Sequence, residues 1–399
     1  MNPMCQRNPT ASALDYPTTA EPIGYHQLHH DRGLEFQLNR FLTLIGPSAL
    51  EELREAAASI NTYDDWITCF LDMAETARAG EQMLAAACYD RAAEFFMKIG
   101  DPRRGPALQR FLVSMREVYG LEPIQVPFGD AALPAYDVRP GDTPRGTIVV
   151  TGGFDGSSEE GFSLLVSLAN AGYRAITFDG PGQGMALEDC DLPMIPEWEQ
   201  PISAILDYFE LDDVTLIGVS LGGGLAIRAA AFERRVRRVV AFDILDDFLE
   251  CIGRQIGPGA TPLLRLLLAV NARPIVNRMA MNAAARNSIT DWGLRHGMHV
   301  TGTSDSFGFF QAARDLNTRG ISDRVVADAL LLAGADDHYV PVSQLHRQAA
   351  ALTGARSVST RLFTQVEQAQ NHCQVGNIGL AVRTIVTWIE SLQPPAVPG

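Results

Sequence analysis

The sequence predicts an α/β fold in which helices flank a mostly parallel central sheet, preceded by a helical N-terminal segment. After Gly120, short β-branched or apolar runs alternate with helical stretches, which is typical of strands buried on both faces of a parallel sheet. Before Gly120, apolar residues recur at helical spacing. A glycine-flanked serine, Ser220, joins one strand-like run directly to a helix-like run, which is typical of a tight strand-to-helix turn in such folds.

The first 120 residues are expected to form several helices, which make a cap beside the sheet. Asp64 precedes one of the periodic runs and is the expected N-cap of that helix. The runs that carry the pattern are EFQLNRFLTLI (35–45), ALEELREAAASI (49–60), DDWITCFLDMAETA (64–77) and QMLAAACYDRAAEFFMKIG (82–100).

Eight strand-like runs follow. They lie in two parts of the α/β core, 121–246 and 321–399, which an insertion separates. The first two runs are joined by a short turn and are expected to form an antiparallel hairpin at the sheet edge. The runs are IQVPF, ALPAYDV, GTIVVTG, YRAITFD, DVTLIGVS, RRVVAFD, ADALLLAG and VSTRLFT. Between the two parts, 247–320 reads as a helical lid insertion, with LLRLLLAVN and PIVNRMAMNAAARN followed by the Gly/Ser/Thr-rich stretch HVTGTSDSFGFF.

Composition excludes several classes of protein. The 399 residues carry a net charge of −15, so nucleic acid and anionic membrane surfaces are expected to be poor partners. The six cysteines include no CxxC pair and are expected to be reduced. The sequence begins without a recognisable signal peptide and holds no apolar stretch of membrane-spanning length, which predicts a cytoplasmic protein.

The chemistry is expected to begin at Ser220. Gly218 and Gly222 flank this serine two positions either side, in a strand-to-helix elbow where only small neighbours fit. Such a turn lifts the hydroxyl above the sheet and places it at a helix N-terminus, whose dipole favours developing negative charge. Ser220 is therefore the predicted nucleophile.

The partners of the serine are expected in the chain order Ser, Asp, His. Asp336 and Asp337 both follow the strand-like run ADALLLAG, and the spacing from Gly334 to Pro341 favours Asp337 as the acid. His372 follows the last strand-like run and is the predicted general base. His338 lies on the same turn as the acid and is not expected to bridge it to the serine.

An oxyanion hole needs two backbone N–H groups near the nucleophile. One is expected from Leu221, directly after the serine. The other is assigned to Phe154 in the glycine-rich loop that follows GTIVV, with Gly153 as the next candidate.

Two further patterns point to structure and not to a cofactor or metal. The run Gly180 to Gly184 follows a strand but departs from GxGxxG at Met185, so a tight loop is expected and no dinucleotide. His296 and His299 have HxxH spacing without a neighbouring acid cluster, which favours a structural or lid role over a metal site.

Five motifs in order give the chain a family resemblance. GGFDGSSEE, FDGPGQGM, GVSLGGGLAIRAAAFE, GADDHYVP and NHCQVGN, together with the helical N-terminal region, resemble one branch of the α/β-hydrolases. That branch includes the fungal polyketide-shortening (heptaketide) hydrolases and 2,6-dihydropseudooxynicotine hydrolase. The resemblance spans most of the chain from about residue 34, but the lid carries no matching motif.

The resemblance implies hydrolysis of a carbon–carbon bond in a β-diketone-type or acyl substrate, in secondary metabolism or catabolism. It also implies a small-molecule substrate and a homodimer. The same triad would serve a carboxylesterase, lactonase or thioesterase, or an acyl-transfer or cyclising enzyme, because triad geometry does not select the leaving group. A binding protein with a vestigial triad is the non-enzymatic alternative.

Overall fold

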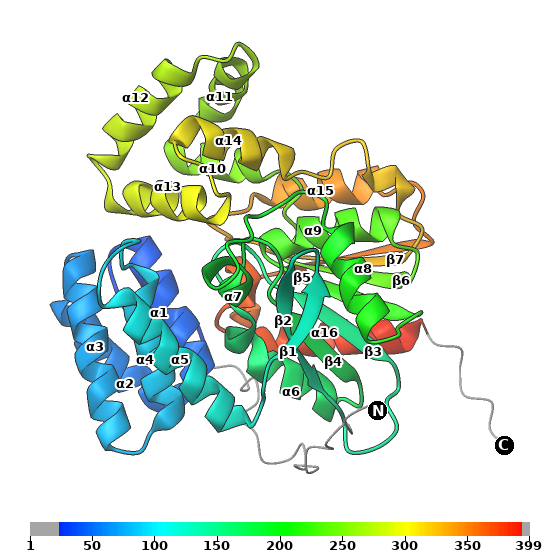
Figure 1. Cartoon of the computed structure of the whole chain (residues 1–399), viewed down its shortest axis with the longest axis horizontal. Helices are drawn as coiled ribbons and strands as arrows, with labels where there is room; N and C mark the ends of the chain where they lie inside the picture. The colour runs from blue at the N-terminus through cyan, green and yellow to red at the C-terminus, as the bar shows by residue number, and fades with distance from the viewer. Residues whose placement is uncertain (1–23, 393–399) are drawn as a thin grey trace.

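A single eight-stranded sheet forms the centre of the protein in the computed structural model, which describes residues 24–392 (Figure 1). The strands are β1 (Ile124–Phe128), β2 (Ala131–Val138), β3 (Thr147–Thr151), β4 (Arg174–Phe178), β5 (Val214–Val219), β6 (Val236–Phe242), β7 (Asp328–Gly334) and β8 (Ser357–Phe363). They lie in the order β1-β2-β4-β3-β5-β6-β7-β8. Strand β2 is antiparallel to both β1 and β4, and all other neighbours are parallel. The predicted sheet and its edge hairpin are confirmed.

Helices cover both faces of the sheet because successive strand side chains point to opposite sides. Val149, Leu216 and Val239 pack on one face, in a core shared with the helices that follow β5 and β7. Ile148 and Ile217 pack on the other face. The helices of the core are α6 (Phe162–Asn170), α7 (Gly184–Glu188), α8 (Glu199–Tyr208), α9 (Leu221–Phe232), α15 (Val342–Ala351) and α16 (Ile378–Ser391).

The N-terminal helices form a bundle with its own core beside the sheet (Figure 1). Trp66 is fully buried there, and its indole Nε1–H donates to the Ala92 carbonyl at 2.7 Å. One predicted cap is wrong. Thr62, and not Asp64, is the N-cap of the helix Tyr63–Ala79, because Thr62 and Asp65 form a reciprocal capping box. The helices are α1 (Arg32–Ile45), α2 (Leu50–Ser59), α3 (Tyr63–Ala79), α4 (Met83–Phe95) and α5 (Arg104–Tyr119).

The segment predicted to be a lid forms five helices, which lie between β6 and β7 and extend away from the sheet (Figure 1); we call these helices the lid for their position only. They are α10 (Phe248–Ile256), α11 (Ala260–Ala269), α12 (Arg273–Ala284), α13 (Ser288–Val300) and α14 (Ser306–Asp315). The Gly/Ser/Thr-rich stretch before Phe310 is partly helical, which its composition did not predict. The Asp305 side chain accepts the Gly308 N–H at 2.9 Å and starts α14, and the phenylalanines of this helix are buried.

A buried ion-pair cluster ties the N-terminal helices to the loop after β3. Glu160 accepts from Arg40 at 2.6 Å and from Arg91 at 2.8 Å, and the Glu160 side chain is only 8% exposed. The Arg91 guanidinium also donates to the Asp155 carbonyl. From the lid, the Trp292 indole N–H donates to the Phe95 carbonyl at 2.7 Å. The helical bundle, the lid and the core therefore meet around one loop.

No helix in residues 24–392 is long and apolar enough to cross a membrane. Cys69, Cys88, Cys190, Cys251 and Cys373 are free thiols. Cys5 lies outside the described residues, as does the N-terminal sequence in which no signal peptide is predicted.

The Glu160 cluster gives a prediction about stability. Glu160→Gln removes the carboxylate that Arg40 and Arg91 share and leaves Asp155 and Glu94 as their remaining acidic partners, so we expect the free energy of unfolding to fall by up to about 3–5 kcal/mol. Glu51→Gln is the matched control, because Glu51 pairs with Arg54 at an exposed site, where a change of at most about 0.5 kcal/mol is expected. Urea denaturation followed by circular dichroism measures both. Equal losses in the two variants would show that the cluster does not stabilise the fold.

Candidate active site

Ser220 lies at the turn between β5 and α9 in a backbone conformation that residues other than glycine rarely adopt, with φ 60° and ψ −123°. Close packing holds the turn: a Cβ at Gly218 would lie 1.8 Å from the Gly222 carbonyl oxygen, so no larger residue fits. The Ser220 N–H donates to the Phe242 carbonyl at 2.7 Å. The predicted strand-to-helix elbow is thus present in the structure.

His372 reaches the serine from the loop after β8. Its Nε2 lies 2.8 Å from Ser220 Oγ, and its Nδ1 lies 2.6 Å from Asp337 Oδ2. Burial alone would lower the pKa of His372, but the Asp337 carboxylate more than offsets that effect and raises the pKa well above its usual range. The three predicted side chains therefore form one continuous hydrogen-bonded chain.

The structure places Asp337, and not Asp336, against the histidine. Asp337 is buried, and its second oxygen accepts the N–H groups of Tyr339 at 2.7 Å and Val340 at 2.9 Å. Although burial raises the pKa of Asp337, the charge and hydrogen bond of His372 lower it overall. Asp336, by contrast, is exposed.

His338 takes no part in the chain of contacts around Ser220. Its ring packs against Phe36 and Tyr339, with ring centroids 4.9 and 3.8 Å away. Burial lowers the pKa of His338 to about 3, so this imidazole is neutral near pH 7.

A second carboxylate, Asp243, lies beside the histidine and was not among the predicted site residues. It directly follows β6, and its Oδ2 is 3.6 Å from His372 Nδ1. The same carboxylate accepts the Cys373 N–H at 2.9 Å and the Gln374 amide at 3.2 Å, so it holds the histidine loop. Burial and the nearby Asp337 charge raise the pKa of Asp243 to about 7. Its position at the end of the strand-like run RRVVAFD was the available sequence signal.

The loop after β3 brings Phe154 to the same site. A Cβ on Gly153 would lie 2.8 Å from the Val219 carbonyl and 3.2 Å from the Leu221 nitrogen, so glycine lets this loop approach the elbow closely. Gly153, Phe154, Ser220 and Leu221 line one cavity. Neither the Phe154 nor the Leu221 amide donates a hydrogen bond to any residue in 24–392, which leaves both N–H groups available for an oxyanion.

Two side chains hold this loop by its carbonyl groups, and sequence reasoning gave neither of them this role. The Gln183 amide donates to the carbonyls of Gly152 at 2.8 Å and Gly153 at 3.0 Å, so the tight loop expected at 180–184 braces its neighbour. From α13 in the lid, His296 Nε2 lies 3.0 Å from the Phe154 carbonyl. His299 contacts Glu188 at 2.9 Å instead, so the HxxH residues have separate partners.

The cavity beside Ser220 has a volume of about 900 Å³. Its lining is mainly apolar, and the lid supplies much of it, including Phe248, Leu264 and Phe309. Arg40, Asp155 and Glu160 also line it and bring charge from the N-terminal side. A cavity of this size and character suits a mainly apolar small molecule with a few polar groups.

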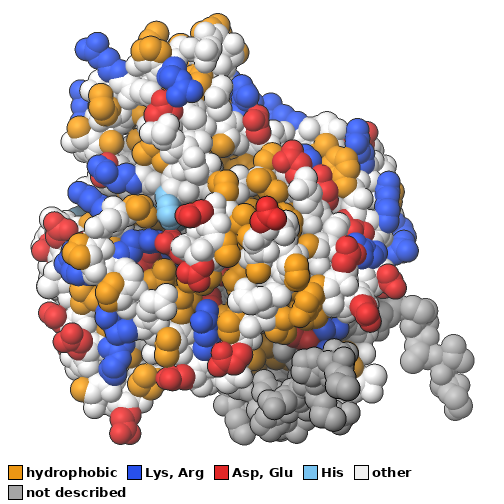
Figure 2. All heavy atoms as spheres, in the orientation of Figure 1, with side chains coloured by type: hydrophobic (Ala, Val, Ile, Leu, Met, Phe, Trp, Pro, Cys, Tyr) orange, Lys and Arg blue, Asp and Glu red, His pale blue; other side chains and the backbone are white. Residues whose placement is uncertain are grey.

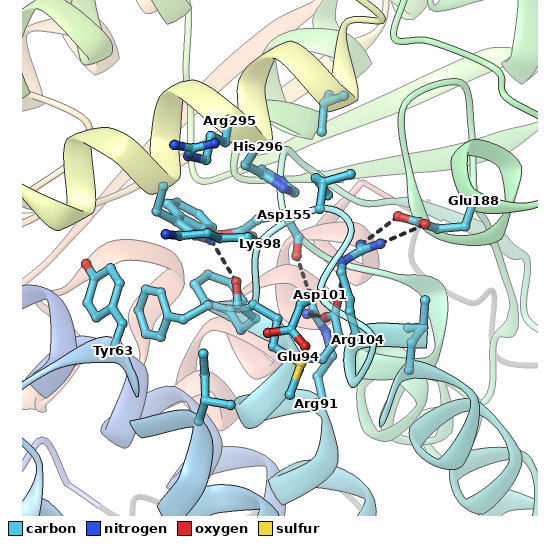
Figure 3. Close-up of a pocket in the computed structure, with 18 of the residues that line it drawn as sticks. Tyr63, Arg91, Glu94, Lys98, Asp101, Arg104, Asp155, Glu188, Arg295 and His296 are labelled. Atoms are coloured by element: carbon cyan, nitrogen blue, oxygen red, sulfur yellow. Dashed lines mark hydrogen bonds and ion pairs between the residues drawn. The ribbon is translucent and has the colours of Figure 1, made fainter. Parts of the chain in front are cut away.

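A second cavity of about 500 Å³ lies between the N-terminal helices and α13 (Figure 3). Its walls carry many charges, and most are paired: Arg104 contacts both Glu94 and Glu188. The segment from Phe154 to Ser157 lines this cavity and the larger one, so it forms part of the wall between them.

One group of side chains in the described residues has metal-ligand chemistry. Atoms of Asp243, His372 and Cys373 lie within 4.8 Å of one another. Both ring nitrogens of His372 are already engaged, by Ser220 and Asp337, so a metal there would have to displace one of them. The arrangement fits proton transfer better than metal binding.

Substitution of the two neighbouring aspartates distinguishes their roles. Asp337→Asn removes the charge that stabilises the imidazolium, and we expect kcat to fall by about 10⁴-fold. Asp336→Asn is the matched control, with an expected change of less than about threefold, because its side chain is exposed. Steady-state hydrolysis of a p-nitrophenyl ester measures both. A larger effect at Asp336 would assign the acid to that position.

The pH dependence of kcat/KM tests the electrostatics around His372. The imidazole must be neutral to accept the Ser220 proton, so activity falls as pH drops through its pKa. Because that pKa is raised, we expect the acid limb above the ordinary histidine value of about 6.5. Asp243→Asn removes a nearby negative charge that favours imidazolium, so the limb moves to lower pH.

Asp328→Asn is the control for that shift, since Asp328 is equally buried but lies at the opposite end of β7, beside Arg356. We expect its acid limb to match the wild type. If the acid limb of kcat/KM lay at the same pH in the Asp243 and Asp328 variants, Asp243 would not act on the histidine.

The chain is similar in sequence to fungal hydrolases. Relatives include the 20-hydroxy-prefusarin hydrolase of Gibberella moniliformis, 26% identical over 403 residues, which span 88% of this chain and 95% of that protein. The hydrolase acrC of Aspergillus aculeatus is 29% identical over 307 residues, covering 68% of this chain and 70% of the relative. The predicted resemblance to fungal hydrolases is confirmed.

Solved structures share the fold. The crystal structure of 2,6-dihydroxy-pseudo-oxynicotine hydrolase superposes with a TM-score of 0.63 at 20% identity, over 88% of this chain and 95% of that one. The structure of AbyA5 gives a TM-score of 0.66 at 18% identity, over 91% and 96% of the two chains. A family model described as "Alpha/beta hydrolase family" matches residues 148–373, which are more than half of the chain. The protein therefore belongs to the α/β-hydrolase family.

Proposed function

We propose that this α/β-hydrolase is a serine hydrolase that cleaves a carbon–carbon bond in a β-diketone-type or acyl small molecule. The observation that carries the proposal is the chain of contacts Ser220–His372–Asp337, which opens onto a large, mainly apolar cavity. A hydroxyl within 2.8 Å of a buried imidazole is placed to lose its proton as it attacks a carbonyl.

The first half of the proposed reaction forms an acyl-enzyme. Ser220 Oγ bonds to the ketone carbon while His372 Nε2 takes its proton, and the Leu221 and Phe154 amides hold the oxyanion. When the carbonyl re-forms, the carbon–carbon bond breaks and its electron pair leaves as an enolate. His372 returns the proton to the enolate, which departs as a ketone.

The second half releases the acyl group. Water attacks the ester carbon, His372 takes the water proton and returns it to Ser220 Oγ, and a carboxylic acid leaves. A carbanion leaves readily only if a second carbonyl or an electron-rich ring stabilises it, so the substrate needs one of these. We propose that the enzyme carries out this reaction in the cytoplasm, as part of secondary metabolism or catabolism. The resemblance also implies that the enzyme acts as a homodimer.

An ester, lactone or thioester is the second candidate substrate, since the same steps apply with oxygen or sulfur as the leaving atom. Acyl transfer to another acceptor than water also uses the first half unchanged. The relatives' names favour small molecules of secondary metabolism: one of them is named for 20-hydroxy-prefusarin.

Active-site labelling tests the nucleophile. We expect a fluorophosphonate probe to label the wild type, and Ser220→Ala to abolish labelling and lower kcat by about 10⁵–10⁶-fold. Ser59→Ala is the control, because its hydroxyl lies in the N-terminal helices and contacts the Ala56 carbonyl. A wild type that remains unlabelled would support the binding-protein alternative.

Product analysis then tests the bond. Aryl β-diketones and p-nitrophenyl esters are incubated with the wild type, and the products are identified by mass. We expect each diketone to give one ketone and one carboxylic acid. Turnover of esters alone would refute carbon–carbon cleavage and leave the nucleophile assignment intact.

A further inference from the structure

The lid has a charge distribution unlike that of the rest of the chain. Residues 251–290 contain five arginines and no lysine, aspartate or glutamate, whereas the whole chain has 47 acidic against 32 basic residues. Arg265 pairs with Asp247 and Arg273 with Asp305. Arg278 and Arg286 are exposed and form no ion pair within residues 24–392. This part of the lid is therefore locally cationic.

The same part of the lid exposes large apolar side chains. Eight of the fifteen exposed large apolar side chains in the described residues fall between 256 and 289. They are Ile256, Leu263, Leu266, Val270, Ile275, Met279, Met281 and Ile289. On α11, Leu263 and Leu266, with Val270 just beyond the helix, recur at helical spacing and form one outward apolar stripe. We call the exposed side chains of 256–289 the α11–α12 surface.

This surface is continuous with the active-site cavity. Ile256, Leu263, Met279 and Ile289 are exposed, and each also lines the cavity that contains Ser220. An apolar molecule held at the surface would therefore meet apolar side chains all the way inward. Leu266, Val270, Ile275 and Met281 belong to the surface but do not line the cavity.

We propose that the α11–α12 surface docks on an anionic lipid surface, from which an apolar substrate enters the cavity. Arginines with interleaved Leu, Ile and Met match the pattern of segments that lie in the headgroup region, where apolar side chains insert and cations meet lipid phosphates. Binding does not depend on the proposed chemistry, because it can be measured without substrate.

Other occupants fit this surface less well. Two copies that met through this surface would bring two cationic surfaces together, and like charges would oppose that contact. Of the residue types that are enriched in protein interfaces, 251–290 contains Arg and Met but no Phe, Trp or Tyr, so it lacks the aromatic anchors expected for a protein partner.

The net charge of −15 does not oppose the docking of this surface. Helices α11 and α12 form one end of the molecule, away from the sheet and the N-terminal bundle (Figure 1). Figure 2 shows apolar and basic side chains at that end. At physiological ionic strength, charges more than about 8 Å away are largely screened. A membrane would therefore meet the local arginines, so the expectation drawn from the average charge does not apply to this surface.

Vesicle sedimentation with the full chain tests the proposal. We expect wild-type protein to bind phosphatidylcholine vesicles that contain about one-third phosphatidylglycerol at least about tenfold more tightly than pure phosphatidylcholine, and to dissociate in high salt. Arg278→Gln with Arg286→Gln, and separately Leu266→Ser with Val270→Ser, are each expected to weaken binding by about tenfold.

Matched controls lie outside the lid. Arg237→Gln removes an exposed arginine on strand β6, and Val366→Ser removes a side chain that is 95% exposed. We expect both controls to bind vesicles as the wild type does. Circular dichroism melting curves and turnover of a water-soluble ester are expected to be unchanged in all four variants, which shows that each is folded.

Three outcomes would overturn the proposal. One is wild-type binding that is no tighter to anionic than to neutral vesicles. Another is a dimer, seen in sedimentation equilibrium, that Leu266→Ser with Val270→Ser splits while vesicle binding is unaltered, which would make the surface an interface between copies. The third is binding to a purified acidic acyl carrier protein in the absence of vesicle binding.

Discussion

Close packing around Ser220 is the constraint on which the rest of the site depends. The serine keeps a strained backbone conformation only because the loops beside it leave no room to relax: Gly218 and Gly222 touch, and Gly153 packs on the carbonyl before the serine. Parallel strands bring their carboxyl ends to one edge of the sheet, so the acid after β7 and the histidine after β8 arrive beside the same turn. The sheet positions the reactive atoms, and the glycines allow the approach.

Electrostatics around the histidine involve more than the predicted acid. Asp337 and Asp243 both lie in contact range of one buried imidazole, and each also accepts backbone N–H groups. Burial and the neighbouring Asp337 charge raise the pKa of Asp243, whereas the charge and the hydrogen bond of His372 outweigh burial and lower the pKa of Asp337. The site is thus a coupled group of three titratable side chains and not a simple pair.

The loop after β3 is where the three parts of the protein meet. Arg91 from the N-terminal bundle donates to the Asp155 carbonyl, His296 from the lid contacts the Phe154 carbonyl, and Gln183 from the core holds the carbonyls before it. Because each brace takes a carbonyl oxygen, the N–H groups of the loop stay available. The bundle and the lid therefore hold the backbone of the loop that carries the expected oxyanion donor, although both lie outside the sheet.

By itself, the sequence determined the α/β architecture, the eight strands and the residues Ser220, His372 and Asp337 as candidates, since those depend on local patterns of period, turn and spacing. The sequence did not decide whether Asp336 or Asp337 is the acid that contacts the histidine. Side chains of neighbouring residues point to different surroundings, and only packing shows which of the two is buried. Asp243, Gln183 and His296 came from tertiary structure alone: their contacts join segments from 30 to 142 residues apart. Likewise, composition gives one net charge, whereas the fold decides that the lid's arginines and exposed apolar side chains share a surface, because side-chain burial follows from three-dimensional packing.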